Sequence, residues 1–244
     1  GFYGGRVLSL LSTNECCAVI PARGGSKGIP GKNIKLLNGK PLLQYTVDSL
    51  KEAGCFDRIL VTSDSYEILS VASDLGVETH LRTEKRESND VIMPDIPTIT
   101  CLEAIPEEIR PEFAFMVQCT SPFVTSDTYQ RAHRALLDRP DVTVFAAHEA
   151  HFFLWQEATL SKHRSVWQPI NHPFHERIGR QFVKHQQVNE LGAFYGFKTA
   201  SFIEARHRFF SEALPVLLKS DEIIDIDTLD DWALAEFKLH KKYG

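Results

Sequence analysis

The sequence contains little sulfur: of its 244 residues, only five are cysteine and two are methionine. The number of cysteines is odd, and no two of them are spaced as Cys-x-x-Cys, the arrangement found in many zinc and redox sites. Most of the cysteines stand in apolar stretches. We therefore expect reduced, buried thiols in a cytoplasmic protein, and no disulfide framework.

A long hydrophobic run and an excess of positive charge are also missing. No apolar stretch is long enough to span a bilayer, and residues 7–11 are too short for the core of a signal peptide. We therefore expect no membrane partner, and we interpret residues 1–14 as a poorly ordered tail or cloning remnant. The net charge is −5, from 27 Lys and Arg against 32 Asp and Glu, which argues against nucleic-acid binding through bulk charge. A bound polyanion would need a local basic site.

Strand-like and helix-like patterns alternate along residues 15–244, whose length suits a single domain. Proline at the start and glycine at the end bracket the helix expected at 41–53, and Ser126 is a plausible N-cap for the helix at 126–137. The other expected helices lie at 65–75, 97–105, 199–206 and 230–241, and the expected strands at 16–20, 58–62, 77–81, 113–117, 142–146, 192–197 and 223–227. This alternation predicts an α/β fold with a parallel, doubly wound sheet.

Residues 148–190 interrupt the alternation with many His, Gln and aromatic residues and no helical period. One interpretation is an irregular surface excursion, and another has its aromatics folded back onto the sheet. We favour an arm that packs on a second subunit in a homodimer, because the aromatic cluster at 152–155 would otherwise be exposed. The histidine pairs at 148/151 and 172/175 lie on no convincing helix and have no third ligand nearby, which disfavours zinc.

The most informative stretch is residues 21–33, PARGGSKGIPGKN, which directly follows the first expected strand. Its four glycines allow the backbone to fold tightly and to bring N–H groups close to an anion, and Arg23, Lys27 and Lys32 add three cations. Open α/β sheets bind ligands at this end of their strands. A flexible turn with solvated charges is the alternative. The stretch fits neither a Walker A loop nor a dinucleotide fingerprint, because Ser26 and Arg23 stand where those motifs need glycine.

Two carboxylates alternate with isoleucine near the end of the chain. If residues 223–227 form a strand, Asp225 and Asp227 project from the same face. Adjacent carboxylates repel each other unless a cation lies between them, and hard oxygen ligands suit Mg²⁺ together with substrate phosphates. The alternative is a solvent-facing edge that leads to a helix cap at Thr228. A phosphate-binding loop in the same chain favours the metal interpretation.

Polar residues follow two further strands at the same edge of the sheet. Gln118, which has donors and acceptors suited to a sugar or base edge, begins the run QCTSP. Thr120 and Ser121 in this run could instead cap a helix-leading turn. Arg82 follows the strand at 77–81 and, considered alone, could be an ordinary surface charge.

These stretches together resemble the opening and later motifs of the acylneuraminate cytidylyltransferases (CMP-sialic acid synthetases). The resemblance extends from Cys17 nearly to the end of the chain and is carried by residues 20–33, VTSD at 61–64, LR at 81–82, QCTSP at 118–122 and DID at 225–227. It implies a nucleotidyltransferase fold with a Rossmann-like, doubly wound, mostly parallel mixed sheet, a dimerisation arm at about 148–190, and catalytic Mg²⁺ on the two aspartates. The implied reaction joins CMP from CTP to a 2-keto-3-deoxy sugar acid and releases pyrophosphate.

The resemblance also implies roles for individual residues. Arg180, just before the strand at 192–197, would help to hold the acidic sugar together with Gln118. Arg23, Lys27 and Lys32 would stabilise the leaving pyrophosphate. The expected catalytic residues are Arg23, Lys32, Arg180, Asp225 and Asp227, and the expected nucleotide-binding residues are Arg23, Gly24, Lys27, Lys32, Asn33, Arg82, Gln118, Thr120 and Ser121.

The sequence departs from the family pattern at two places. Asp90 is followed by VIMP rather than by small hydroxyl residues, and Leu191 precedes Gly192 where the family often has asparagine. These departures leave the acceptor open between N-acetylneuraminate and another sialic-acid-like sugar acid. Two alternatives remain: an enzyme for 3-deoxy-manno-octulosonate or another sugar, and a nucleotide-binding regulator without turnover. The pair of aspartates argues against the regulator, because binding alone would not need two metal carboxylates.

Overall fold

The computed structural model describes residues 16–26, 28–83, 93–150, 152–161, 164–173, 175, 179 and 187–243. Its centre is a seven-stranded sheet, in which β10 runs antiparallel to both of its neighbours and every other adjacent pair is parallel. The spatial order is β11 (Ala213–Leu217), β7 (Thr143–Glu149), β10 (Val188–Lys198), β6 (Phe113–Val117), β1 (Cys16–Pro21), β4 (Arg58–Ser63) and β5 (Glu78–Leu81). The predicted α/β fold with a mostly parallel mixed sheet is confirmed.

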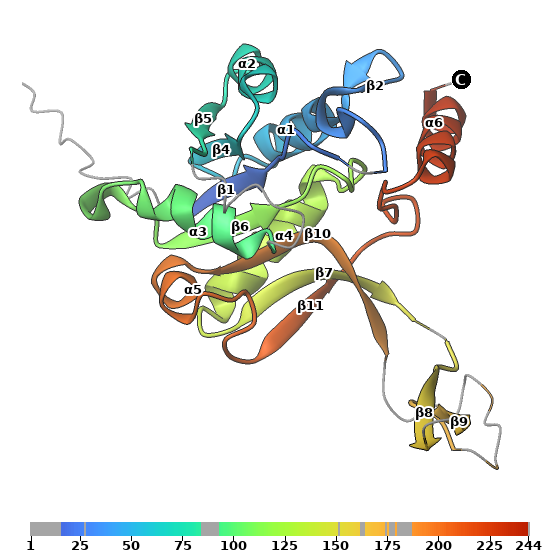
Figure 1. Cartoon of the computed structure of the whole chain (residues 1–244). Helices are drawn as coiled ribbons and strands as arrows, with labels where there is room; N and C mark the ends of the chain where they lie inside the picture. The colour runs from blue at the N-terminus through green and yellow to red at the C-terminus, as the bar shows by residue number, and fades with distance from the viewer. Residues whose placement is uncertain are drawn as a thin grey trace, which may run out of the picture.

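Helices cover both faces of the sheet, as Figure 1 shows. One face packs against α1 (Leu42–Ala53), α2 (Tyr66–Asp74) and α4 (Ser126–Asp138), and the other against α3 (Asp95–Glu103) and α5 (Thr199–Ala205). Alternate residues of β1 serve the two faces: Ala18 and Ile20 belong to the first core cluster, whereas Val19 belongs to the second. All three are fully buried, which explains why β1 reads as a continuous apolar run.

The C-terminal helix α6 (Leu229–Tyr243) packs outside the two main layers. Trp232 and Leu239 contact a small hairpin made of β2 (Leu36–Leu37) and β3 (Lys40–Pro41) in a cluster that also holds Ile29. The helix therefore lies beside the chain that leaves the glycine-rich loop. No helix in the described ranges has the length and apolar character needed to cross a bilayer.

Three local predictions are wrong. Residues 223–227 do not form a strand but an extended segment without a ladder, and the edge strand that the sequence analysis missed is β11, ten residues earlier. Burial still alternates in the segment, with Ile224 and Ile226 in the core and the aspartates outward of them. Ser126 is the first residue of α4, and the N-cap position belongs to Thr125. Helix α3 also begins two residues earlier than expected, at Asp95.

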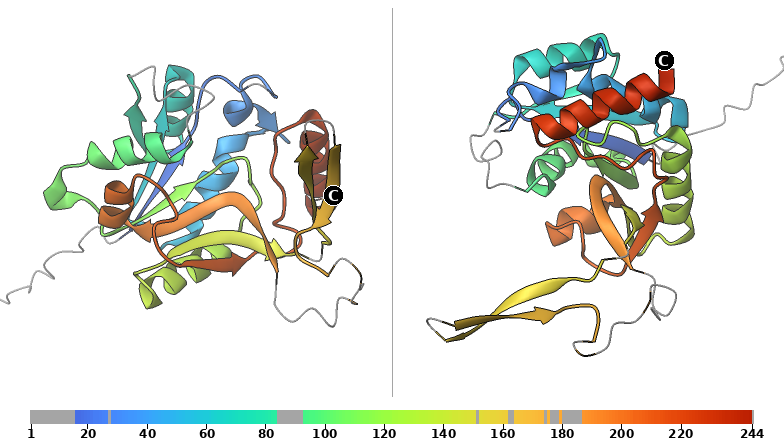
Figure 2. Two further views of the ribbon diagram at one scale, coloured as in Figure 1. Left: turned by 60° about the horizontal axis from the view of Figure 1, so that its bottom comes forward. Right: turned by 90° about the vertical axis from the view of Figure 1, so that its right-hand side faces the viewer.

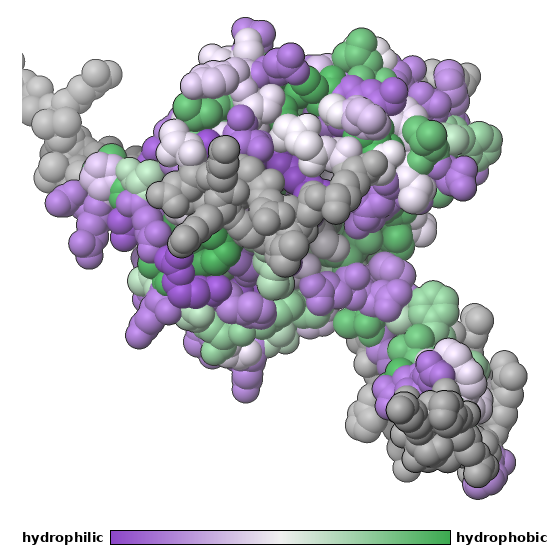
Figure 3. All heavy atoms as spheres, viewed as in Figure 1, coloured by the Kyte–Doolittle hydropathy of each residue, from purple (hydrophilic) through white to green (hydrophobic). Residues whose placement is uncertain are grey.

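The predicted arm contains a two-stranded antiparallel hairpin of β8 (Trp155–Ser161) and β9 (Arg164–Pro169). The hairpin projects from the body of the molecule in Figures 1 and 2, and Figure 3 shows hydrophobic side chains where it joins the body. The amide of Asn171 ties the base together by donating to Phe152 O at 2.7 Å and Gln187 Oε1 at 2.9 Å. Trp155 and Trp167 are 46% and 62% exposed. The sheet–helix body therefore does not cover these aromatics.

Candidate active site

The glycine-rich loop is anchored to the neighbouring strand end. Gly24 N donates to Asp64 Oδ1 at 2.8 Å, and Ala22 N donates to Thr62 O at 2.9 Å. The Arg82 guanidinium reaches under the loop and donates to Ala22 O at 3.2 Å and to Asp64 at 3.3 Å. The carboxylate of Asp64 thus joins a loop amide to a buried cation. Asp64 is a functional candidate that the sequence analysis quoted but did not assign, and its place directly after β4 was the available signal.

Asn33 and Arg82 support the loop from below. Asn33 is buried; its side-chain amide donates to Arg23 O at 2.9 Å and accepts from the thiol of Cys119 at 3.2 Å. The Arg82 side chain is only 3% exposed. Both residues lie at the predicted site. Their hydrogen bonds to Arg23 O and Ala22 O hold the loop in place.

Lys32 connects the loop to residues 223–227, the aspartate segment. Lys32 and Asp227 are 195 residues apart in the sequence. It begins a short 3₁₀ turn at Lys32–Ile34, and its side chain is largely buried. The ammonium donates to Ile226 O at 2.6 Å and to Asp227 Oδ1 at 2.9 Å. Gly28 meets the same segment, because a Cβ built on it would lie 2.3 Å from Asp227 O. The structure therefore brings together the two motifs that the sequence analysis treated separately.

Asp225 lies in a more buried position than Asp227, whose side chain is 71% exposed. Burial raises the pKa of Asp225, and a hydrogen bond from Thr120 opposes that shift. The nearby Asp227 carboxylate raises the pKa further, and Lys32 lowers it. One carboxylate oxygen, Oδ1, is buried without a hydrogen-bond partner among the described residues. A buried acceptor without a donor costs free energy, so this position favours a bound cation or a proton.

The aspartate segment is held at both ends. Ile226 N donates to Thr120 O at 2.9 Å, which ties the segment to the loop that follows β6. At the far end Thr228 and Asp231 cap α6 reciprocally: Asp231 Oδ2 accepts from Thr228 N at 2.8 Å, and Thr228 Oγ1 accepts from Asp231 N at 3.2 Å. The cap expected at Thr228 is therefore present, together with the carboxylates beside it.

Gln118 begins the loop after β6 and lies against β10. Its backbone N donates to Ala193 O at 2.8 Å, and its side-chain Nε2 would be 3.2 Å from a Cβ on Gly192. Glycine at 192 thus leaves room for the amide at the edge of the sheet. Three residues further on, Ser121 is buried, and its hydroxyl has no hydrogen-bond partner among the described residues. Gln118, Thr120 and Ser121 therefore lie on one loop between the aspartate segment and β10.

Three predicted features lie outside the described residues. These are Lys27 in the loop, Arg180 in the arm and the tail at 1–14. Asp90 and the residues directly after it are also outside. In the described ranges, no group of three or more His, Cys, Asp and Glu side chains gathers in a way that could hold a metal ion. A cation at this site would rely on two aspartates and on ligands from a substrate.

The cysteines offer no nucleophile. All five are free, four of them are buried, and burial raises the pKa of Cys119, next to Gln118, to about 12. A thiol with such a pKa is protonated at neutral pH and is a poor nucleophile. The prediction of reduced, buried thiols is confirmed for all but the half-buried Cys55. The chemistry of the site thus depends on cations, carboxylates and backbone amides.

A family model described as cytidylyltransferase matches residues 17–191. The chain is 31% identical to the CMP-N,N'-diacetyllegionaminic acid synthase of Legionella pneumophila, over 90% of this chain and 94% of that protein. It is 26% identical to the pseudaminic acid cytidylyltransferase of Campylobacter jejuni, over 89% and 93% of the two chains. It is also 31% identical to the N-acylneuraminate cytidylyltransferase of Oncorhynchus mykiss, where the match spans 90% of this chain and 49% of the relative.

The fold is similar to that of a solved CMP:2-keto-3-deoxy-manno-octonic acid synthetase complexed with CTP. The TM-score is 0.70, the sequence identity is 13%, and the match covers 93% of this chain and 99% of the other. At this identity the likeness establishes the shared fold.

Proposed function

Because the chain belongs to the cytidylyltransferase family, we propose that it transfers CMP from CTP to a sialic-acid-like 2-keto-3-deoxy sugar acid and releases pyrophosphate. The observation that carries this proposal is the direct contact between the glycine-rich loop and the aspartate segment, made by Lys32 and by the close approach of Gly28. A loop of amides and cations next to two carboxylates suits a triphosphate that is bound together with a divalent cation.

In this reaction the anomeric hydroxyl of the sugar attacks the α-phosphorus in line, and the bond from that phosphorus to the pyrophosphate oxygen breaks. Arg23, Lys27 and Lys32 stabilise the negative charge that develops on the leaving pyrophosphate. Asn33 and Arg82 hold the loop in place through Arg23 O and Ala22 O. The chain's contribution is mainly positioning and electrostatic stabilisation, as in phosphoryl transfer generally.

Asp225 and Asp227 fit Mg²⁺ as a cofactor. The buried oxygen of Asp225 that has no hydrogen-bond partner among the described residues supports this assignment, because carboxylate oxygen is the ligand that Mg²⁺ prefers. Asp227 is already paired with Lys32, so Asp225 would gain most from a cation. When bound, Mg²⁺ would offset the charge of the triphosphate. Lys32 keeps Asp227 close to the loop.

The acceptor is proposed from the relatives and from the loop that carries Gln118. The proteins at 26–31% identity are named for pseudaminic, N,N'-diacetyllegionaminic and N-acylneuraminic acids. Gln118, held beside Gly192, can bind hydroxyl or carboxyl groups of such a sugar, and Arg180 would pair with its carboxylate. The alternative acceptor, 3-deoxy-manno-octulosonate, is favoured by fold likeness alone.

A pyrophosphate-release assay with CTP and a panel of 2-keto-3-deoxy sugar acids tests the proposal. We expect turnover with at least one nonulosonate, no turnover with 3-deoxy-manno-octulosonate, and loss of activity in EDTA that added Mg²⁺ restores. Asp225→Asn and Asp227→Asn should each lose most turnover while remaining folded. CTP binding without pyrophosphate release, whichever acid is added, would instead identify a regulator.

We also propose that the protein forms a homodimer through the arm. The hairpin of β8 and β9 has only two strands, which is marginal in water on its own. Its tryptophans are 46% and 62% exposed, so binding a second copy would remove from water about half of the roughly 150–250 Å² that each aromatic side chain can bury. Light scattering should give twice the mass of the chain, and Trp155→Asp with Trp167→Asp should give a folded monomer. A wild-type monomer, or a dimer that survives both changes, would place the interface elsewhere or remove it.

A cytoplasmic location fits the same proposal. All five cysteines are free, as is usual for proteins kept in a reducing compartment. Fractionation of the source cells with a cytoplasmic marker enzyme tests this directly.

A further inference from the structure

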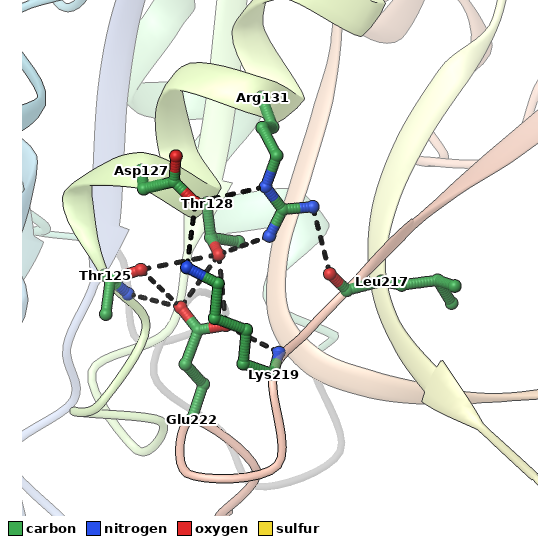
Figure 4. Close-up of polar contacts among 7 residues, drawn as sticks. All are labelled: Thr125, Asp127, Thr128, Arg131, Leu217, Lys219 and Glu222. Carbon is green, nitrogen blue, oxygen red and sulfur yellow. Dashed lines mark hydrogen bonds and ion pairs between the residues drawn. The ribbon is translucent and has the colours of Figure 1, made fainter.

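A buried carboxylate outside the proposed catalytic residues fixes the start of the aspartate segment. Glu222 has no exposed surface, and its carboxylate accepts hydrogen bonds from three residues of two separate segments. Thr125 donates from N at 2.8 Å and from Oγ1 at 2.6 Å, Thr128 Oγ1 donates to both oxygens at 2.8 and 3.0 Å, and Lys219 N donates at 2.7 Å. Figure 4 shows these donors converging on the carboxylate.

No cation is among these direct partners. Arg131 donates to Thr128 Oγ1 at 2.7 Å and to Leu217 O at 3.0 Å, and the ammonium of Lys219 pairs with Asp127 at 3.1 Å. The buried carboxylate of Glu222 is instead satisfied by the Lys219 amide and by hydroxyl and amide groups at the N-terminus of α4, where the helix dipole also favours a carboxylate. Glu222 thus binds Thr125, the N-cap residue of α4, through both its amide and its hydroxyl.

Glu222 lies close in sequence to the proposed metal ligands, so its contact with α4 can affect where they lie. It stands three residues before Asp225, and the segment between them has no strand ladder to fix its position. Thr125, on the other side of the contact, stands five residues after Thr120, which binds Ile226 N and the Asp225 carboxylate. The two segments are therefore joined at two points, one at each end.

We propose that Glu222 is a positioning residue for the aspartate pair. By fixing residues 219–222 to the start of α4, it sets where the following residues lie. Asp225 is then held at Thr120 and Asp227 at Lys32. This inference rests on the proposed function for its kinetic consequence, but its structural part concerns the protein alone.

Glu222→Gln keeps the shape of the side chain and removes the charge that orients the surrounding donors. The matched control is Asp127→Asn, which breaks the ion pair with Lys219 in the same cluster without touching Glu222. Thr128→Val is a second variant that removes one donor and leaves Glu222 in place, in case Glu222→Gln does not fold. A simple loss of stability would lower the Tm of each variant without affecting the site.

Hydrogen–deuterium exchange of the metal-free protein is the first measurement. We expect the peptide covering residues 223–228, which includes the Ile226 amide, to exchange about tenfold faster in Glu222→Gln and Thr128→Val but not in Asp127→Asn. Unchanged exchange in this peptide would overturn the proposal, even if the protein proves to have a different activity.

The second measurement is the Mg²⁺ dependence of pyrophosphate release. Displacement of the aspartates should raise the Mg²⁺ concentration at half-maximal rate by about tenfold in Glu222→Gln, with kcat at saturating Mg²⁺ within about threefold of wild type. A lower Tm with an unchanged Mg²⁺ requirement would show that Glu222 serves stability only, and would overturn the proposal.

Discussion

Alanine at position 28 would place a methyl group where the backbone of Asp227 already lies. The added Cβ would be 2.3 Å from Asp227 O, whereas real Cβ contacts essentially never fall below 3.0 Å. The obstacle is a backbone oxygen, so it cannot rotate away as a side chain could. In Gly28→Ala the loop and the aspartate segment must therefore move apart by about 0.7 Å.

That displacement acts on the proposed site more than on the fold. Gly28 and Asp227 are exposed, so the change removes no core contact, and forced backbone shifts of this kind cost about 1–3 kcal/mol. The bond from Lys32 to Asp227 Oδ1, now 2.9 Å, would lengthen or break. Because misplacing reacting groups by ~1 Å costs about 100-fold in rate, we expect kcat/KM to fall by roughly 10- to 100-fold.

Steady-state pyrophosphate release and a thermal melt test this prediction together. Gly25→Ala is the stability control, because a Cβ there meets nothing within 4 Å, and its Tm should match wild type. Any activity lost in that control would report crowding of the bound phosphates, since no protein atom is displaced. If Gly28→Ala retains kcat/KM within threefold of wild type, contact between loop and aspartate segment is not required for the reaction.

Three further predictions concern charge and thiols. Asp225→Asn should raise the Tm of the metal-free protein by about 2–4 °C, because removing the charge of a carboxylate with a buried, unpartnered oxygen adds about 1 kcal/mol to the free energy of unfolding. A thermal melt without Mg²⁺ measures this, and a lower Tm would contradict it. The hydrogen bond from Arg58 lowers the pKa of Glu78, so their pair adds stability above the ordinary glutamate pKa and loses it as the pH falls through the lowered value. At pH 7 the free energy of unfolding of Glu78→Gln should therefore be lower than that of wild type by less than about 1 kcal/mol, and the difference should vanish in strong acid. A difference that persists in strong acid would have a cause other than this ion pair. A thiol reagent at neutral pH should label Cys55 slowly, because burial raises the pKa of Cys55 to about 11. The other four cysteines are buried and should react only after unfolding. Rapid labelling of more than one thiol in the native protein would contradict the packing described.

The sheet could be predicted from sequence because its strands are buried on both faces. Residues 16–20 form an unbroken apolar run, and β1 indeed has helices on either side. The helix at 41–53 was bounded equally well, since Gly54 adopts a left-handed conformation at its end. Local chemistry of this kind is present in the residues themselves and does not depend on distant partners.

The segment at 223–227 shows where such reasoning fails. Its alternation of isoleucine and aspartate is the pattern of a strand, and Ile224 and Ile226 are indeed buried. The pattern reports which side chains face the core and not whether a neighbouring strand is available for pairing. Here the partner is a loop, at Thr120, and a cluster with α6 supplies the apolar contacts.

Glu222 could not have been found from sequence for the same reason. A glutamate among charged and polar residues indicates a solvent-exposed turn, yet its two threonine partners lie 94 and 97 residues away along the chain. Asp64 gave a weaker signal, because it follows a buried strand as ligand-binding residues often do. Its hydrogen bond with Gly24 N depends on how the glycine-rich loop folds against the end of β4, which the sequence alone does not show.

The pairing of β7 with β10 affects how this protein family can diverge. Val188 pairs with Glu149 and Asn189 with His148, so the chain leaves the sheet and returns to it at adjacent points. For an excursion closed in this way, each doubling of its length costs only about 0.6 kcal/mol of chain entropy. Insertions, deletions and exchanged sequences in the arm are therefore thermodynamically inexpensive, whereas the register that holds Gly192 beside Gln118 stays fixed by the rest of the strand. The arm can therefore change in sequence and length while the glycine-rich loop and residues 223–227 keep their arrangement.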